Sequence, residues 1–120
     1  MIRQGDIYWY DFGTPRQSEP GYRRPVVVIQ NDIANRSAIQ TTIICALTTN
    51  LRLARAPGNA LLDTGEANLP QRSVVNVSQI LTINKGELID DAYIGALSQL
   101  RISEIVAGVI VFLRPTRPRR

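Results

Sequence analysis

Residues 21–32 read GYRRPVVVIQND, and they predict a β-strand that is covered on both faces. Residues 26–29 are all β-branched and apolar, which is typical of a strand with no face in water. Pro25 suits the first residue of such a strand, where a backbone N–H is not needed. Proline also holds the residue before it in an extended conformation, so we expect the Arg24 side chain to leave the strand mouth in a defined direction.

The composition predicts one globular domain over residues 1–113 and a short tail. Of the 120 residues, 44% are hydrophobic and 20% are charged, which is ordinary for a soluble protein with one core. Residues 114–120, RPTRPRR, hold four of the 14 basic residues and no acidic residue. We expect this Arg/Pro-rich tail to be disordered, either simply solvated or with a non-specific affinity for phosphate.

The N-terminal residues and the longest apolar stretch bear on localisation. Residues 1–6, MIRQGD, lack the apolar core of a signal peptide, and no apolar stretch is long enough to span a bilayer. We therefore expect a cytoplasmic protein with no membrane partner. The single Cys45 lies in an apolar run, which predicts a small buried hydrophobic residue and not a reactive thiol.

Short apolar runs separated by turn-forming residues predict a mainly β fold of the α+β class. Polar stretches at 13–21 and 49–59 are expected to be loops, and 49–59 contains Arg52 and Arg55. Ser98 is a candidate N-cap for a C-terminal helix that ends before Pro115. The fold expected is a small antiparallel β-barrel with a C-terminal α-helix. The expected strands are 6–12, 25–30, 41–47, 60–62, 73–77 and 79–83, and the expected apolar helix face is Ile102, Ile105, Val106, Val109, Ile110 and Leu113.

The residue types that are missing restrict the chemistry. The chain has no histidine and one cysteine, which makes a zinc site very improbable, and Asp90 and Asp91 would point to opposite faces of an extended segment. We expect neither a metal nor another cofactor. An enzyme built from this sequence would work with arginine, hydroxyl, amide and carboxylate groups, and such groups suit a phosphate substrate.

Six short blocks follow one another along the chain: Gly5-Asp6-Ile7-Tyr8, Ser18-Glu19, Gly21 with residues 24–32, Ala46-Leu47-Thr48, Ser73-Val74-Val75 and Ser78-Gln79-Ile80. Together, in this order, they resemble the MazF/PemK family of toxin endoribonucleases. The likeness extends from Gly5 to about Leu113. Two features depart from the family pattern: Pro20 stands where the family usually has glutamine, and the tail after Leu113 is not a family feature.

The resemblance implies a homodimer of SH3-like barrels that binds single-stranded RNA on a shared concave face and cuts it without a metal. In the family, the arginine before the proline and the threonine that ends the third strand carry the chemistry, which places Arg24 and Thr48 in the catalytic site. The ribose 2′-hydroxyl attacks the adjacent phosphodiester and leaves 2′,3′-cyclic phosphate and 5′-hydroxyl ends. Glu19 accepts the 2′-hydroxyl proton, orients Arg24, or is simply a solvated carboxylate in a polar loop.

Candidate RNA contacts lie in the basic part of the chain, which precedes residue 73. Arginines would bind the RNA backbone, and side-chain amides would read the edges of unstacked bases; for each of them a solvated loop residue is the alternative. The candidates are Arg16, Arg23 and Arg52, and Asn31, Asn50 and Gln79.

The resemblance also implies a partner and leaves two other functions open. A toxin of this kind needs a cognate antitoxin, expected to be an acidic, largely disordered chain that covers the RNA face. A similar barrel occurs in CcdB toxins, which bind DNA gyrase and cleave nothing, so a gyrase-binding toxin is the first alternative. A nucleic-acid-binding module without catalysis is the second.

Overall fold

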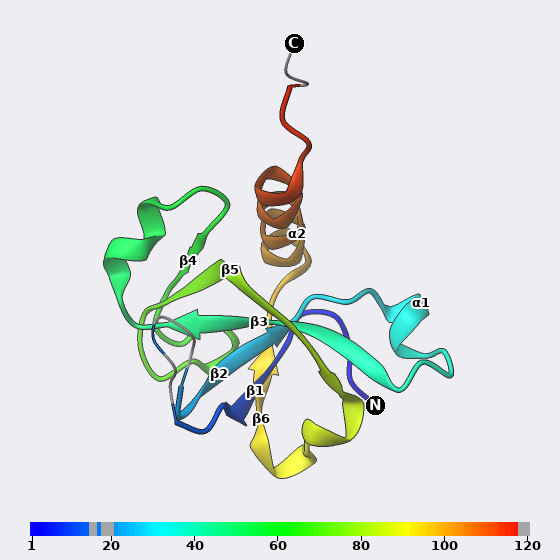
Figure 1. Cartoon of the computed structure of the whole chain (residues 1–120). Helices are drawn as coiled ribbons and strands as arrows, with labels where there is room; N and C mark the ends of the chain where they lie inside the picture. Colours follow the sequence, from blue (N-terminus) through cyan, green and yellow to red (C-terminus); the bar gives the residue numbers. More distant parts are fainter. Residues whose placement is uncertain (15–16, 18–20, 118–120) are drawn as a thin grey trace.

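The computed structural model describes residues 1–14, 17 and 21–117 of the chain. Six antiparallel strands form one sheet in the order β4-β5-β3-β2-β1-β6, and the sheet curls into a half-barrel with helix α2 beside it (Figure 1). This confirms the expected mainly β fold with a C-terminal helix. The strands are β1 (Asp6–Asp11), β2 (Arg23–Val28), β3 (Thr41–Thr48), β4 (Ala60–Leu62), β5 (Ser73–Asn84) and β6 (Tyr93–Ala96).

Residues 26–28 of strand β2 are buried on both faces, as the sequence predicts. The strand begins at Arg23 and ends at Val28, not at the expected 25 and 30, so Pro25 is its third residue and Ile29 follows it half-buried. Val26 and Val28 pack in one apolar cluster with Tyr8 and Ile44. Val27 points the other way, into a second cluster that contains Leu47 and is completed by α2. Because successive side chains of a strand alternate between faces, a run of three buried valines needs a core on each side. The two cores together fix β2 in the middle of the sheet.

Helix α2 (Gln99–Leu113) begins at the predicted N-cap, where the Ser98 hydroxyl accepts a hydrogen bond from the N–H of Arg101 at 3.2 Å. Its middle lies directly on the turn before β4. A Cβ atom on Gly108 would overlap the carbonyl oxygen of Gly58, which itself has a φ of 80°. The helix can therefore approach this turn at backbone distance only because both residues are glycine.

The apolar face predicted for α2 is buried only in part. Ile105 packs in the core, and Ile102 and Val109 pack against it. Ile110 and Leu113, which share the predicted stripe, are exposed. The last turn extends past the end of the sheet, so the described protomer has nothing there to cover it (Figure 1).

Several elements differ from the sequence expectation. The two runs at 73–77 and 79–83 form a single strand, β5, with an irregular register opposite Cys45 and Leu47 of β3. Strand β6 and the short helix α1 (Asp32–Asn35) were not anticipated, and part of the expected loop 49–59 forms the 3₁₀ helix η1 (Leu51–Arg55). Three more 3₁₀ turns connect the later strands: η2 (Glu66–Asn68), η3 (Lys85–Glu87) and η4 (Asp90–Ala92).

The C-terminal residues that the structure describes, 114–117, belong to no helix or strand. Among the described elements, no helix has both the length and the hydrophobicity that crossing a bilayer requires.

Candidate functional site

The start of β2 and the end of β3 meet at one edge of the sheet. The two strands are antiparallel neighbours that pair Val26 with Ala46. Arg24 lies two residues before Val26 and Thr48 lies two residues after Ala46, so the same register brings them level. Side chains two residues apart share a face, so Arg24 and Thr48 project from the same side of the sheet.

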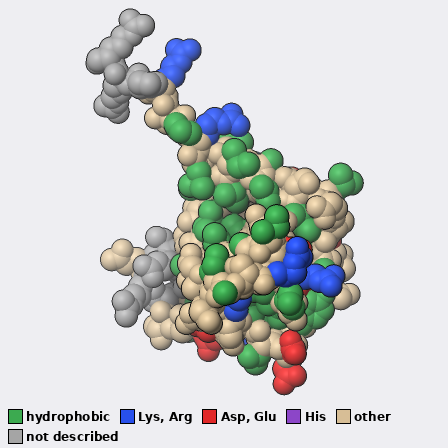
Figure 2. Space-filling model, turned by 90° about the vertical axis from the view of Figure 1, so that its right-hand side faces the viewer, with side chains coloured by type: hydrophobic (Ala, Val, Ile, Leu, Met, Phe, Trp, Pro, Cys, Tyr) green, Lys and Arg blue, Asp and Glu red, His purple; other side chains and the backbone are tan. Residues whose placement is uncertain are grey.

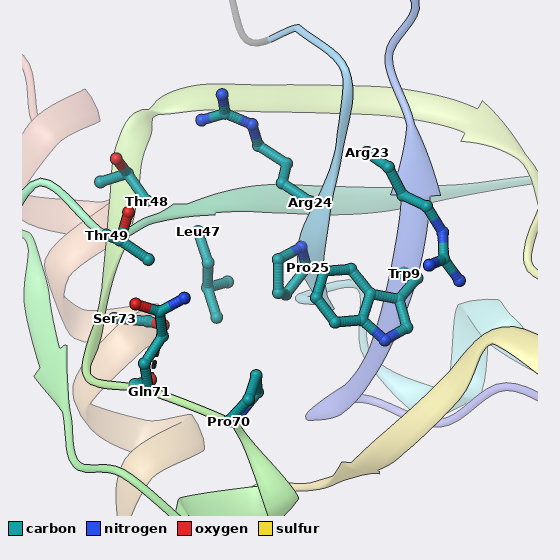
Figure 3. Close-up of a pocket in the computed structure, with 10 residues that line it drawn as sticks. All are labelled: Trp9, Arg23, Arg24, Pro25, Leu47, Thr48, Thr49, Pro70, Gln71 and Ser73. Carbon is teal, nitrogen blue, oxygen red and sulfur yellow. Dashed lines mark hydrogen bonds between the residues drawn. The ribbon is translucent and has the colours of Figure 1, made fainter.

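Arg24 and Thr48 line one pocket of about 360 Å³ at this edge (Figure 3). The figure shows both along the upper side of the pocket, with Trp9, Pro25 and Pro70 below them. The pocket brings together three residues predicted from the sequence, which are Arg23, Arg24 and Thr48. Its other lining residues are Trp9, Pro25, Leu47, Thr49, Pro70, Gln71 and Ser73.

Arg24 is half-buried, and one of its nitrogens is used to orient it. Its Nε donates a hydrogen bond to the carbonyl oxygen of Gly21 at 3.2 Å. Among the described residues, the ion pairs are those of Arg101 with Glu66 and Glu104, so no described carboxylate neutralises Arg24. The terminal nitrogens of the guanidinium form a planar fork of donors that matches two phosphate oxygens.

The Thr48 hydroxyl is held by the backbone that follows it. Its Oγ1 accepts a hydrogen bond from the N–H of Asn50 at 3.2 Å. A hydroxyl that accepts one bond keeps its own hydrogen to donate. Thr48 therefore offers one oriented donor on the same side of the sheet as Arg24.

Arg23 lies at the opposite side of the pocket from Thr48. Its Cζ is 4.9 Å from the centroid of the Trp9 ring, which is a cation–π contact. The side chain is exposed, so its charge remains accessible to a polyanion. Its position beside the pocket is consistent with the predicted contact to an RNA backbone.

The other RNA-binding candidates lie outside this pocket. Asn31 and Asn50 act as helix caps: their Oδ1 atoms accept from the N–H groups of Ala34 at 3.0 Å and Arg52 at 3.3 Å. Arg52 is exposed on η1, where it lines a shallow hollow with Leu51 and Arg55. The amide NH₂ groups of both asparagines are not used by these caps.

Gln79 lies on β5 between Val75 and Ile80, where the register with β3 is irregular. It is not among the lining residues of the pocket. Two further candidates, Arg16 and Glu19, lie outside the described residues.

The pocket contains residues that the sequence interpretation did not select, above all Trp9 and Gln71. Trp9 stands in the expected aromatic strand 6–12, where nothing in the sequence set it apart from its neighbours. Gln71 follows Pro70 in a connecting segment, and nothing in its neighbours distinguishes it from a solvated loop residue. The lining of the pocket in the folded chain shows that Trp9 belongs to the site, and the register of β1 with β2 sets it beside Pro25.

Cys45 is not part of the site. It is fully buried, and burial raises the pKa of its thiol to about 12. Its Sγ donates to the carbonyl oxygen of Asn76 at 2.9 Å. The burial confirms the prediction of a small buried residue. A thiol with a raised pKa is protonated at neutral pH and is a poor nucleophile. Within the described part of the chain, no three Cys, Asp or Glu side chains gather as a group that could hold a metal ion.

Fold and pocket define a small half-barrel protein with an arginine-lined site suited to a phosphate group. The chain belongs to the family of PemK-like, MazF-like toxins of type II toxin–antitoxin systems, whose family model matches residues 3–113. The resemblance inferred from the six sequence blocks is thereby confirmed.

Named relatives agree with this assignment. Endoribonuclease MazF6 of Mycobacterium tuberculosis (strain H37Rv) is 47% identical over 90 residues, which cover 75% of this chain and 79% of that protein. Endoribonuclease EndoA of Bacillus subtilis is 38% identical over 90 residues, covering 75% and 77%. Because the relatives are endoribonucleases, they support this enzyme class for the chain.

Solved structures show the same fold. A mycobacterial endoribonuclease in complex with its cognate antitoxin superimposes with a TM-score of 0.75 at 22% identity, covering 98% of this chain and 100% of that one. MazF of Deinococcus radiodurans gives 0.72 at 18% identity, covering 93% and 96%.

Proposed function

We propose that the protein is the toxin of a type II toxin–antitoxin system and a sequence-specific endoribonuclease that cleaves single-stranded RNA without a metal ion. The observation that carries this proposal is that Arg24 and Thr48 line the same side of one pocket. Family membership supports the enzyme class and disfavours the gyrase-binding alternative. Since its substrate would be cellular RNA, we retain a cytoplasmic location as part of the proposal.

The reaction requires one bond to form and one to break at a single phosphorus. The ribose 2′-oxygen attacks the adjacent phosphorus and loses its proton, and the bond from phosphorus to the 5′-oxygen breaks. The products carry a 2′,3′-cyclic phosphate and a 5′-hydroxyl, the latter after the leaving oxygen takes up a proton. The step needs no oxidant, reductant or cofactor.

Arg24 and Thr48 have complementary roles in this mechanism. The Arg24 guanidinium binds non-bridging oxygens and stabilises the charge that develops on the pentacoordinate phosphorus. The Thr48 hydroxyl donates to one of the same oxygens. Arginine is a poor base because its pKa lies above about 12, so another group must accept the 2′-hydroxyl proton. Glu19 is the candidate for that role or for the orientation of Arg24.

The RNA strand would extend from the pocket along residues that carry free donors. Arg23 stands beside the pocket and Arg52 on η1 after β3, and both are exposed. Gln79 would contact the RNA from β5, and Asn31 and Asn50 keep amide hydrogens while they cap helices. Arg16 completes the proposed set of RNA contacts.

Two protein partners belong to the proposal. A second copy of the chain would cover the end of α2, where residues 110–113 are four consecutive apolar side chains that are 47–66% exposed. Figure 2 shows hydrophobic side chains gathered below the C-terminal tail, in the region of α2. A cognate antitoxin with an acidic, largely disordered segment would lie over the arginine-lined pocket and compete with RNA.

Incubation of the purified protein with a long unstructured RNA in EDTA tests the activity. Cleavage supports the nuclease, and RNA retention without cleavage supports a binding module. If the RNA is neither cleaved nor retained, the gyrase-binding toxin is the remaining alternative. A 2′-deoxy nucleotide at the cut site should abolish cleavage, because it removes the nucleophile. A product with a 3′-hydroxyl end, detected by mass spectrometry, would contradict attack by the 2′-oxygen.

A further inference from the structure

Apolar side chains line the pocket below Arg24 and Thr48 in Figure 3. Trp9 and Pro25 are direct partners in the pairing of β1 with β2, so their rings lie next to each other. Leu47 is buried and closes the floor between them and β3. A phosphate group gains nothing from contact with apolar side chains, whereas the face of an aromatic ring system stacks on them favourably.

Arg23 fixes the indole and leaves its pocket side open. The guanidinium lies 4.9 Å from the ring centroid, on the far side of Trp9 from Gln71 in Figure 3. Trp9 is nevertheless a lining residue of the pocket, so part of the ring remains accessible from within. A fixed aromatic ring is a better stacking partner than a mobile one, because less conformational freedom is lost on binding.

Polar groups stand at the opposite wall. Gln71 extends from the connection before β5 into the pocket, and the side chain is exposed (Figure 3). Its amide has both a donor and an acceptor, which is the requirement for reading the edge of a base. The Gln71 backbone is restrained as well, since its carbonyl accepts a hydrogen bond from the Ser73 hydroxyl at 3.0 Å.

We propose that the part of this pocket between Trp9 and Gln71 is a subsite for one unstacked nucleobase. The base stacks on the Trp9 ring, and the Gln71 amide forms hydrogen bonds with its edge. The base belongs to a nucleotide that adjoins the phosphate held by Arg24 and Thr48. A volume of about 360 Å³ is near the lower end of ligand sites, roughly 300–1,000 Å³, and suits one ring system. This inference rests on the proposed endoribonuclease function and adds a specificity determinant to it.

The chain contains a single tryptophan, so fluorescence excited at the long-wavelength edge, where the four tyrosines do not absorb, reports on Trp9 alone. The experiment uses the full-length protein and an RNA oligomer that carries a 2′-deoxy nucleotide at the cut site, so that it binds without being cut. Titration should quench the Trp9 emission. A series of oligomers, each with one abasic ribose, should include one position next to the cut site that removes the quenching while fluorescence anisotropy still detects binding.

Substitutions test the two side chains separately. Trp9→Ala should weaken binding of the uncleavable oligomer by about five- to hundredfold, the usual effect of losing one base stack, whereas Trp9→Phe should retain most of it. Gln71→Ala leaves the strands untouched and should change the preference for the base at the identified position, with little effect on binding of the abasic oligomer. Arg72→Ala, an exposed neighbour outside the pocket, serves as the matched control.

The subsite and the nuclease can fail independently. RNA that is cleaved and bound without any change in Trp9 emission, or quenching that persists at every abasic position, would overturn the subsite and leave the nuclease intact. Failure to cut any RNA would instead overturn the proposed function. A Gln71→Ala variant with unchanged base preference would remove Gln71 from the subsite even if the stacking on Trp9 is observed.

Discussion

The backbone N–H of Asn50 donates to the hydroxyl oxygen of Thr48 across 3.2 Å, so the last residue of β3 has its side chain oriented by the turn that follows. The bond uses one acceptor site of the oxygen and leaves the hydroxyl hydrogen for a ligand. Asn50 in turn caps η1 with its own side chain. The position of the Thr48 donor is thus linked to the conformation of the segment that carries Arg52.

Thr48→Val should lower the rate constant of RNA cleavage by about ten- to hundredfold, because one hydrogen bond to a charged group is lost while the shape is kept. Thr48→Ser should retain most of the activity. Single-turnover cleavage of a saturating RNA substrate measures both. Equal activity of the valine variant and the wild type would remove Thr48 from the mechanism.

Arg24→Ala should lower kcat by on the order of 10²–10³, the usual loss on removing one preorganised donor to a transition state. Arg24→Lys should recover little, since lysine provides a point charge without a planar fork. The variants are compared by steady-state kinetics after circular dichroism has verified folding. Arg23→Ala is the neighbouring control and should raise KM more than it lowers kcat. A larger loss of kcat in Arg23→Ala than in Arg24→Ala would refute the assignment.

The ion pair between Glu66 and Arg101 should make part of the stability dependent on pH. Burial alone would raise the pKa of the Glu66 carboxyl, but hydrogen bonds from Arg101 and from the N–H of Asp63 outweigh it and hold the pKa below the ordinary 4.5. An acid with a lowered pKa in the folded state contributes stability above its unfolded pKa, and this is lost as the pH falls through the folded pKa.

Glu66→Gln should therefore reduce the free energy of unfolding at pH 7 by up to about 1 kcal/mol, and the difference from the wild type should shrink as the pH falls below 4.5. Urea unfolding at several pH values measures it. Glu104→Gln removes the more exposed carboxylate on Arg101 and should have a smaller effect. A difference that is constant with pH would show that the ionised form of Glu66 is not what stabilises the fold.

Gly108→Ala should destabilise the protein by about 1–3 kcal/mol, since the new methyl group overlaps the carbonyl of Gly58 and the helix must move away. Alanine is otherwise the better helix residue, so stabilisation would be expected if space were available. Gly86→Ala is the matched control, because a Cβ there meets no atom within 4 Å. Thermal unfolding measures both variants. A lower Tm for Gly86→Ala than for Gly108→Ala would contradict the close contact between Gly108 and Gly58.

Much of the scaffold follows from local pattern. The apolar run of β2 and the cap at Ser98 are strong signals because each rests on neighbouring residues alone. Strand β6 gave no such signal, because it has only four residues. One of them is Gly95, where a Cβ atom would overlap the carbonyl oxygen of Ala67. A close approach between distant segments cannot be inferred from either segment by itself.

The site was predictable to the extent that it repeats a family pattern. Arg24 and Thr48 were identified by resemblance, and the structure shows them on one pocket. Asn31 and Asn50 were selected for their amides, but the helices that they cap were not foreseen. Trp9 and Gln71 were missed because their convergence depends on strand register and on the path of the chain before β5, which are properties of the folded molecule.

The division of the pocket between strands and connections has an evolutionary consequence. Arg24 and Thr48 stand on two central, hydrogen-bonded strands, whereas Gln71 stands on a connecting segment and Arg52 on the short 3₁₀ helix η1. Substitutions in the connections leave the strand ladder undisturbed and are tolerated more readily than changes within it. On the proposed function, descendants of this chain could therefore acquire new RNA targets, one connection at a time, while Arg24 and Thr48 are inherited unchanged.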